Sequence, residues 1–178
     1  MNTERTYSID LNAEIDRLFD DSSLPGADQP SAVVLMGGVA AGKTHLRIKD
    51  YSRGYVLIDA AEMFHHLSRG DGMLDFPDAF AEPLELIGPM VADRAVSERR
   101  HIVTEIIGQD VPTTMELISA LQAAGYKVEV LGVTCDPEEA FRRNLHRGDN
   151  ISAYFAGPFQ TRWIIEACGK AAGGGQSG

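Results

Sequence analysis

Cysteine is scarce in this chain of 178 residues, since only Cys135 and Cys168 are present and they form no CxxC pair. Such isolated thiols indicate reduced cysteines in a cytoplasmic protein and argue against a disulfide scaffold. Long apolar runs are also missing, because no stretch approaches the roughly 18 apolar residues of a membrane span. The first residues, MNTERTYSID, contain no apolar signal core. The sequence therefore predicts neither a membrane segment nor secretion.

Positively charged residues are in the minority. The chain has 16 Lys and Arg against 26 Asp and Glu, which gives a formal net charge of −10. A surface of this sign repels duplex nucleic acid and anionic membranes, so neither is expected as a general partner. The hydrophobic share of 44% and the charged share of 24% are ordinary for a globular protein and exclude global disorder. The length corresponds to one domain.

Four apolar runs predict the strands of a buried parallel sheet. They cover residues 32–36, 55–58, 101–104 and 128–133. Continuous apolar runs of this length are typical of strands buried on both faces. Helical patterns are found at 43–52, 60–68, 89–99, 113–124 and 137–147. The alternation predicts an α/β fold, a parallel sheet with helices on both faces, whose ligands bind at the carboxyl ends of the strands.

Pro83 lies between the second and third predicted helices and Pro89 is the first residue of the third, and we expect these prolines to break the intervening chain. Residues 1–30 are polar and acidic, with a partial apolar stripe from Ile9 to Phe19. This stripe predicts a short helix that either packs on the domain or serves as an arm for a partner, followed by a linker.

The remainder of the chain divides into two parts. Residues 31–172 are expected to form the main domain, and the Gly-rich residues 173–178 are expected to form a flexible tail.

Residues 37–44, GGVAAGKT, match the phosphate-loop pattern G-x-x-x-x-G-K-[ST]. Glycines let the backbone curl so that its N–H groups cradle phosphate oxygens, and the helix that begins near Lys43 adds its positive end. Lys43 is expected to contact the β- and γ-phosphates, and the Thr44 hydroxyl to bind Mg²⁺. The motif follows a buried-type strand and opens a helix, so it predicts binding of ATP or GTP. The loop residues expected at the nucleotide are Gly37, Gly38, Val39, Ala40, Ala41, Gly42, Lys43 and Thr44.

The absence of two further sequence motifs limits which class of phosphate-loop protein this chain can be. Switch GTPases add D-x-x-G and N-K-x-D, and neither occurs here. Large ATPase modules need a longer chain. A short chain with a lid-like segment favours a P-loop kinase-like fold and a small-molecule kinase.

Three acids stand at the predicted strand ends. Asp59 follows the second strand and is placed to hold or deprotonate an acceptor hydroxyl, or to cap the helix that follows. Glu62 is the second candidate for that role, and its alternative is a first-turn acid favoured by the helix dipole. Glu105 ends the third strand and is expected to bind Mg²⁺ or substrate hydroxyls, unless it is only a strand-end charge.

Arginines cluster near the end of the last predicted helix. Arg142, Arg143 and Arg147 suit the charge that spreads over a phosphoryl group during transfer, and the alternative is a solvated helix end. Residues 148–158 are expected to form a mobile lid, with Arg162 just beyond it as a second lid or substrate arginine.

Taken together, these elements resemble the zeta-toxin family of P-loop kinases, whose relatives include the chloramphenicol phosphotransferases. The resemblance covers residues 32–165. It rests on the phosphate loop, Ile58-Asp59 with Glu62-Met63-Phe64, Val103-Thr104-Glu105 with Gly108, and Pro137-Glu138 followed by Arg147. It implies transfer of a phosphoryl group from ATP or GTP, with Mg²⁺, to a hydroxyl of a small metabolite, which in zeta toxins is a UDP-amino sugar. It also implies an antitoxin or immunity protein as partner.

The resemblance also implies roles for individual residues. Lys43 and Thr44 would bind phosphate and Mg²⁺, Glu105 the substrate or metal, and Arg147 the transferring group. For the base it leaves Asp59 and Glu62 as alternatives, because many relatives carry an Asp where this chain has Ala61. Two other functions stay open, namely a nucleoside, sugar or antibiotic kinase, and a non-catalytic nucleotide-binding module.

Overall fold

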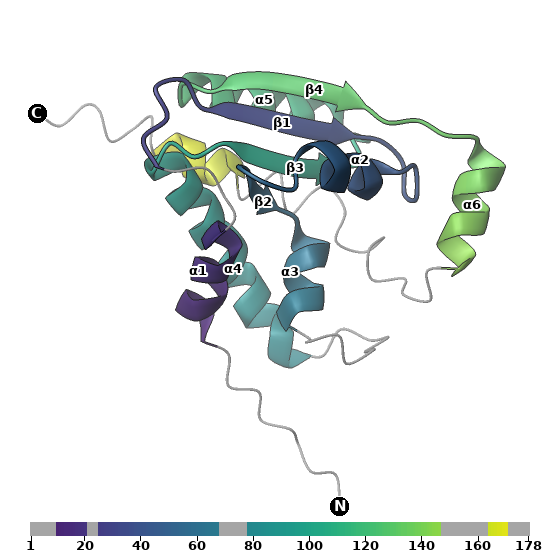
Figure 1. Cartoon of the computed structure of the whole chain (residues 1–178), viewed down its shortest axis with the longest axis horizontal. Helices are drawn as coiled ribbons and strands as arrows, with labels where there is room; N and C mark the ends of the chain where they lie inside the picture. The colour runs from purple at the N-terminus through teal and green to yellow at the C-terminus, as the bar shows by residue number, and fades with distance from the viewer. Residues whose placement is uncertain (1–9, 21–24, 68–77, 147–163, 171–178) are drawn as a thin grey trace, which may run out of the picture.

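A computed structural model describes residues 10–20, 25–67, 78–146 and 164–170. Within them, four parallel strands form one sheet in the order β2-β3-β1-β4 (Figure 1). The strands are β1 (Ser31–Met36), β2 (Val56–Ile58), β3 (Ile102–Ile106) and β4 (Lys127–Gly132). In the register, Val33 of β1 lies opposite Val103 of β3 and Glu129 of β4. The predicted parallel α/β sheet is confirmed.

Helices separate successive strands, and their bounds lie close to most of the predicted ones. They are α1 (Leu11–Asp20), α2 (Lys43–Asp50), α3 (Ala60–Leu67), α4 (Asp78–Ser97), α5 (Val111–Ala123) and α6 (Pro137–His146), and residues 164–170 are also helical. Figure 1 shows α6 standing clear of the sheet, beyond the carboxyl end of β4, and none of its residues is buried.

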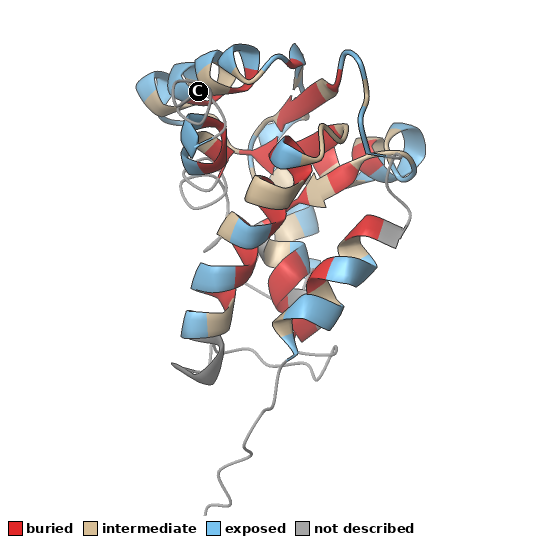
Figure 2. Ribbon diagram, turned by 90° about the vertical axis from the view of Figure 1, so that its left-hand side faces the viewer, coloured by how far each residue is buried: buried red, intermediate tan, exposed pale blue. Residues whose placement is uncertain are grey.

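Alternation along the strands divides the core into two clusters, one on each face of the sheet. Ala32 and Val34 of β1 face the larger cluster, which contains residues of α1, α3, α4, α5 and 164–170. Val33 and Leu35 face the smaller cluster, against which Leu46 of α2 packs. Figure 2 shows buried positions along the strands and on the helix faces that meet them. Helices therefore cover both faces, and the α2 face also holds the phosphate loop.

The prolines do not break the chain as expected. Helix α4 runs through both Pro83 and Pro89 and begins well before residue 89. Its buried side chains, Leu84, Ile87, Val91 and Val96, recur at helical spacing along one face. Burying each one contributes about 1.5–3 kcal/mol, whereas an interior proline costs about 3 kcal/mol. Burial of this face therefore outweighs the local preference of the two prolines.

The prediction that the fourth strand is buried on both faces is wrong. β4 occupies the end of the strand order beside β1, and its residues are exposed or half-buried. Val130, for example, is 37% exposed. An apolar run shows that a segment can enter a sheet, but strand pairing decides whether it becomes a central or an edge strand.

Helix α1 packs on the domain. Ile15 and Phe19 are buried in the larger cluster, and the Arg94 guanidinium lies 4.2 Å from the centroid of the Phe19 ring. Arg94 also pairs with Asp16 at 2.6 Å. The sequence left two alternatives for this helix, packing on the domain or serving as an arm for a partner. In the structure it packs against α4. Among the described residues, no helix is both long and apolar enough to cross a bilayer.

Candidate functional site

The phosphate loop connects β1 to α2 and depends on glycine at two places. Gly42 has φ +110, which L side chains rarely adopt, and it directly precedes the first residue of α2. A Cβ at Gly37 would overlap the carbonyl oxygen of Val133, so the loop passes closely over the end of β4. The loop therefore lies at the carboxyl end of the sheet, as the sequence predicts.

Lys43 folds back over this loop. Its Nζ donates to the carbonyl oxygens of Gly37 at 2.8 Å and Gly38 at 2.9 Å, and the residue is 9% exposed. A buried ammonium held at the start of a helix, among backbone dipoles, forms a compact positive site for an anion.

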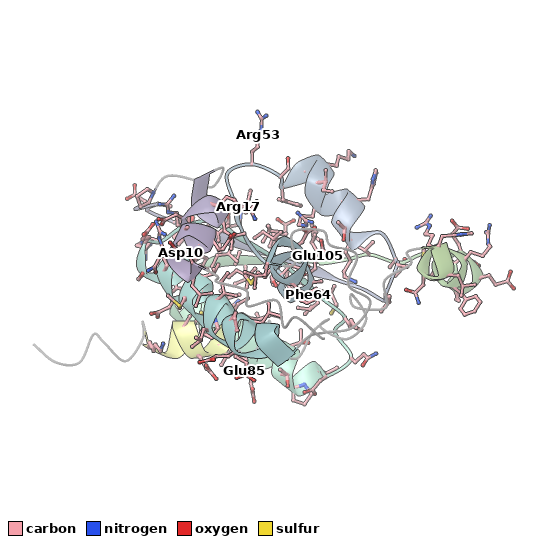
Figure 3. All side chains as sticks on the ribbon, turned by 90° about the horizontal axis from the view of Figure 1, so that it is seen from below. Asp10, Arg17, Arg53, Phe64, Glu85 and Glu105 are labelled. Carbon is pink, nitrogen blue, oxygen red and sulfur yellow. The ribbon has the colours of Figure 1, made fainter. Side chains whose placement is uncertain are left out.

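Glu105 reaches the loop from the neighbouring strand. It lies two positions after Val103 on β3, so its side chain emerges on the α2 face. The Thr44 hydroxyl donates to Glu105 Oε2 at 3.0 Å. Glu105 is 7% exposed, and Figure 3 shows it in the interior of the molecule. The two residues predicted to hold a metal are therefore in direct contact.

Arg47 contacts the same Glu105 carboxylate, and the sequence analysis did not identify it as a site residue. Its Nε donates to Glu105 Oε1 at 2.8 Å, and its Nη2 donates to Glu62 Oε1 at 2.8 Å. The available signal was spacing, since Thr44 and Arg47 are separated by three positions and lie on one face of a helix.

Asp59 and Glu62 occupy the start of α3 and differ in their surroundings. Asp59 is 7% exposed, and its Oδ1 accepts the backbone N–H groups of Ala61 at 2.8 Å and Glu62 at 3.1 Å. Burial, together with the nearby Glu105 carboxylate, raises the pKa of Asp59 to about 6. The Glu62 side chain is 46% exposed. Asp59 is thus a helix cap whose pKa lies near neutral pH, and Glu62 is an accessible carboxylate.

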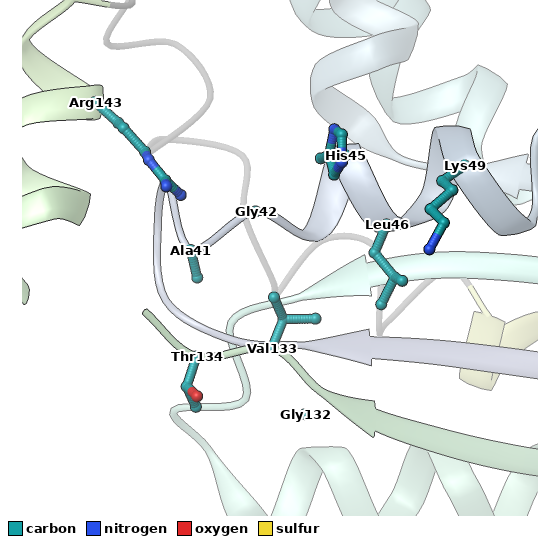
Figure 4. Close-up of a pocket in the computed structure, with 9 residues that line it drawn as sticks. All are labelled: Ala41, Gly42, His45, Leu46, Lys49, Gly132, Val133, Thr134 and Arg143. Carbon is teal, nitrogen blue, oxygen red and sulfur yellow. The ribbon is translucent and has the colours of Figure 1, made fainter. Parts of the chain in front are cut away.

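A cavity of about 740 Å³ opens beside the loop (Figure 4). Its lining includes His45 and Lys49 of α2 and residues 132–134 at the end of β4. It also includes Arg143, which reaches over from α6 toward Ala41. A second cavity of about 470 Å³ lies between the loop, residues 107–108 and Cys135. These cavities have room for the parts of a nucleotide beyond its phosphates.

The predicted arginines have different positions. Arg143 lines the larger cavity and pairs with Glu139 at 2.8 Å. Arg142 also pairs with Glu139, but its side chain is 69% exposed and it lines neither cavity. The prediction for Arg147 and Arg162, and the predicted lid at 148–158, lie outside the described residues.

The oxygens of Thr44 and Glu105 suit a hard cation such as Mg²⁺. In the part of the chain that the structure describes, no group of three or more Asp, Glu, His or Cys side chains could hold a metal by itself. Mg²⁺ bound with a nucleotide usually takes one or two carboxylates and completes its shell with phosphate and water. The hydroxyl and carboxylate beside the phosphate loop fit that pattern.

This parallel sheet, with its phosphate loop between β1 and α2, is the fold of the P-loop kinases. The family model described as "Zeta toxin" matches residues 15–164, and the chain belongs to that family. A solved chain from the PezAT chromosomal toxin–antitoxin system of Streptococcus pneumoniae has the same fold, with a TM-score of 0.57 and 20% identity. The match covers 82% of this chain and 62% of that one. No curated protein sequence matches this chain.

Proposed function

We propose that this protein is a phosphotransferase that moves the γ-phosphoryl group of ATP or GTP to a hydroxyl of a small metabolite. The observation that carries the proposal is the Thr44–Glu105 hydrogen bond beside the buried Lys43. It places a hydroxyl, a carboxylate and an ammonium at one strand-end site, where phosphoryl transfer needs positioning and charge stabilisation.

In the proposed reaction, the acceptor oxygen forms a bond to the γ-phosphorus as the bond from that phosphorus to the β–γ bridging oxygen breaks. The nucleoside diphosphate leaves, and the hydroxyl proton passes to a carboxylate of the Asp59 and Glu62 pair. Lys43 and the loop backbone hold the phosphates. Arg147 is proposed to stabilise charge on the transferring group, and Arg162 to bind the substrate.

Thr44 and Glu105 are the residues that would hold Mg²⁺. The ion, when bound, neutralises charge on the β- and γ-phosphates. Arg47 and Thr44 both bond to Glu105 and so hold its carboxylate in one orientation at the loop.

Membership of the zeta toxin family supports a UDP-amino sugar as the acceptor. The larger cavity, bordered by His45, Lys49 and Arg143, is the proposed location of the nucleotide base and ribose. The structurally similar chain comes from a toxin–antitoxin system, which supports an antitoxin as a protein partner.

The test is product formation. The purified chain is incubated with Mg²⁺, ATP or GTP, and UDP-N-acetylglucosamine, and a mass gain of one phosphate on the sugar nucleotide is measured. A panel of nucleosides, free sugars and aminoglycoside or chloramphenicol antibiotics is run in parallel. Product only from the panel would identify a different acceptor class. No product from any acceptor would contradict the phosphotransferase proposal.

A second function has one observation in its favour. Asp59 Oδ1 is occupied by two backbone N–H groups, and residue 61 is an alanine. A nucleotide-binding module without chemistry would show this arrangement. It predicts that the chain binds Mg²⁺–nucleotide tightly but yields no phosphorylated acceptor in the assay above.

A further inference from the structure

Arg47 is a buried cation at the centre of an acidic cluster. Its side chain is 10% exposed, and it pairs at 2.8 Å with both Glu105 and Glu62. A charged group is costly to bury unless it is paired and hydrogen-bonded. The fork of the guanidinium meets this need by binding one carboxylate through Nε and the other through Nη2.

The two carboxylates come from different elements. Glu105 belongs to β3 and lies next to Thr44, whereas Glu62 belongs to the first turn of α3. Arg47 therefore connects the proposed metal ligand to an acid on another helix. A lysine has a single ammonium on a flexible stem, and it cannot reproduce two directed bonds at a fixed angle.

The two candidate bases, Asp59 and Glu62, differ in their hydrogen-bond partners. Asp59 is buried and uses Oδ1 to cap α3. Glu62 is bound by Arg47 through Oε1, while nearly half of its side chain surface faces outward. Of the two residues, Glu62 is the more exposed, with 46% of its side chain exposed, whereas Asp59 is 7% exposed.

We propose that Arg47 is a positioning residue that orients Glu105 for Mg²⁺ and holds Glu62 as the carboxylate that binds the acceptor hydroxyl, with Asp59 as the cap of α3. This inference rests on the proposed phosphotransferase function. In it, Glu62 accepts the hydroxyl proton as the new oxygen–phosphorus bond forms and the nucleoside diphosphate departs.

The first experiment compares acids at the site. Glu62→Gln, Asp59→Asn and the control Glu85→Gln are assayed with Mg²⁺–ATP and UDP-N-acetylglucosamine, or with the panel acceptor that the wild type converts. Loss of a positioned base typically costs about 10²–10⁴ in kcat, and this loss is expected for Glu62→Gln, with a smaller loss for Asp59→Asn. Glu85 is exposed on α4, and Figure 3 shows it at the periphery. If Glu62→Gln keeps the wild-type rate, the inference is overturned.

The second experiment uses Arg47→Lys, with Arg53→Lys as the matched control. Arg53 is exposed and projects from the surface in Figure 3. The readout is the Mg²⁺ concentration at the midpoint of the ATP-induced rise in melting temperature, which needs no turnover. Removing a residue that orients a metal ligand costs about 10–100-fold in metal affinity or activity. Arg47→Lys is expected to raise the Mg²⁺ midpoint by this factor and to lower kcat. The melting temperature of the free protein is expected to fall modestly, because lysine keeps the buried charge but not both bonds to the carboxylates.

The outcomes separate the inference from the function on which it rests. A wild type that phosphorylates no acceptor contradicts the proposed function, and the Mg²⁺ midpoint of Arg47→Lys then decides the inference by itself. An unchanged midpoint overturns it, because Arg47 would then not orient Glu105. A fall in melting temperature of the free variant with unchanged midpoint and kcat would show a structural role only, and would overturn it too.

Discussion

Thr44 and Glu105 are 61 positions apart in the chain, yet the hydroxyl of one donates to the carboxylate of the other at 3.0 Å. Thr44 is the last residue of the phosphate loop and lies in the first turn of α2, and Glu105 lies on β3, the strand beside β1. This contact links the phosphate loop to Glu105, which Arg47 connects in turn to Glu62 of α3.

Replacing Lys43 with alanine is expected to abolish phosphoryl transfer and leave the fold intact. The Lys43 ammonium bonds to carbonyl oxygens of the loop and does not belong to either apolar cluster. Turnover and the circular dichroism melt of the variant are measured beside Lys127→Ala, an exposed residue at the start of β4. A folded Lys43→Ala variant with wild-type turnover would refute the assignment of the loop.

Mg²⁺ with ATP or GTP is expected to raise the melting temperature of the chain. A ligand that binds only the folded state stabilises it by about 2.7 kcal/mol at one hundred times its dissociation constant. Differential scanning fluorimetry with each nucleotide, with and without Mg²⁺, measures the effect and ranks ATP against GTP. Absence of any shift at saturating nucleotide would contradict nucleotide binding at this loop.

The ionisation of Asp59 should make folding less favourable as the pH rises. Its pKa moves from 3.8 to about 6 on folding, because burial and Glu105 disfavour the charged form. Between these two values the unfolded chain binds fewer protons than the folded one, so the free energy of unfolding decreases with pH. Above the raised pKa, a shift of this size corresponds to a penalty of about 3 kcal/mol.

Asp59→Asn removes this penalty and keeps an oxygen that can cap α3, since Asn and Asp are comparable helix caps. The variant is expected to be more stable than the wild type above the raised pKa and similar to it below 3.8. Urea unfolding across this pH range measures the difference, with Asp110→Asn, an exposed helix-capping position, as control. A constant difference at every pH would show that Asp59 keeps an ordinary pKa.

Phe19→Ala should destabilise the folded chain, because Phe19 packs α1 against the rest of the domain. Phe19 is 5% exposed, and the guanidinium of Arg94 lies over its ring. Truncation of a buried Phe typically costs about 3–5 kcal/mol. Chemical unfolding of the variant, compared with Leu86→Ala at an exposed position of α4, measures the cost. A midpoint equal to that of the wild type would mean that α1 does not pack on the domain in solution.

The sequence by itself determined the features that depend on neighbouring residues. The loop at 37–44 was predictable because its glycines, Lys43 and Thr44 act through a local backbone shape. The cap of α6 is equally local, since Asp136 Oδ1 accepts the N–H groups of Glu138 and Glu139 just after Pro137 begins the helix. Alternation along β3 also fixes the face on which Glu105 emerges, once a strand is assumed.

Tertiary structure decided the rest. Helix α4 runs through Pro83 and Pro89 because burial of its apolar face stabilises it by more free energy than the two prolines cost. That burial depends on residues far away in the chain. The exposure of β4 follows from its place at the end of the strand order. Helical spacing places Arg47 on the same face as Thr44, but its two carboxylate partners follow only from β3 and α3, which bring Glu105 and Glu62 to its guanidinium. Sequence spacing specifies the face of one element, but the partners that a buried charge requires come from other elements, which only the packing of the chain brings together.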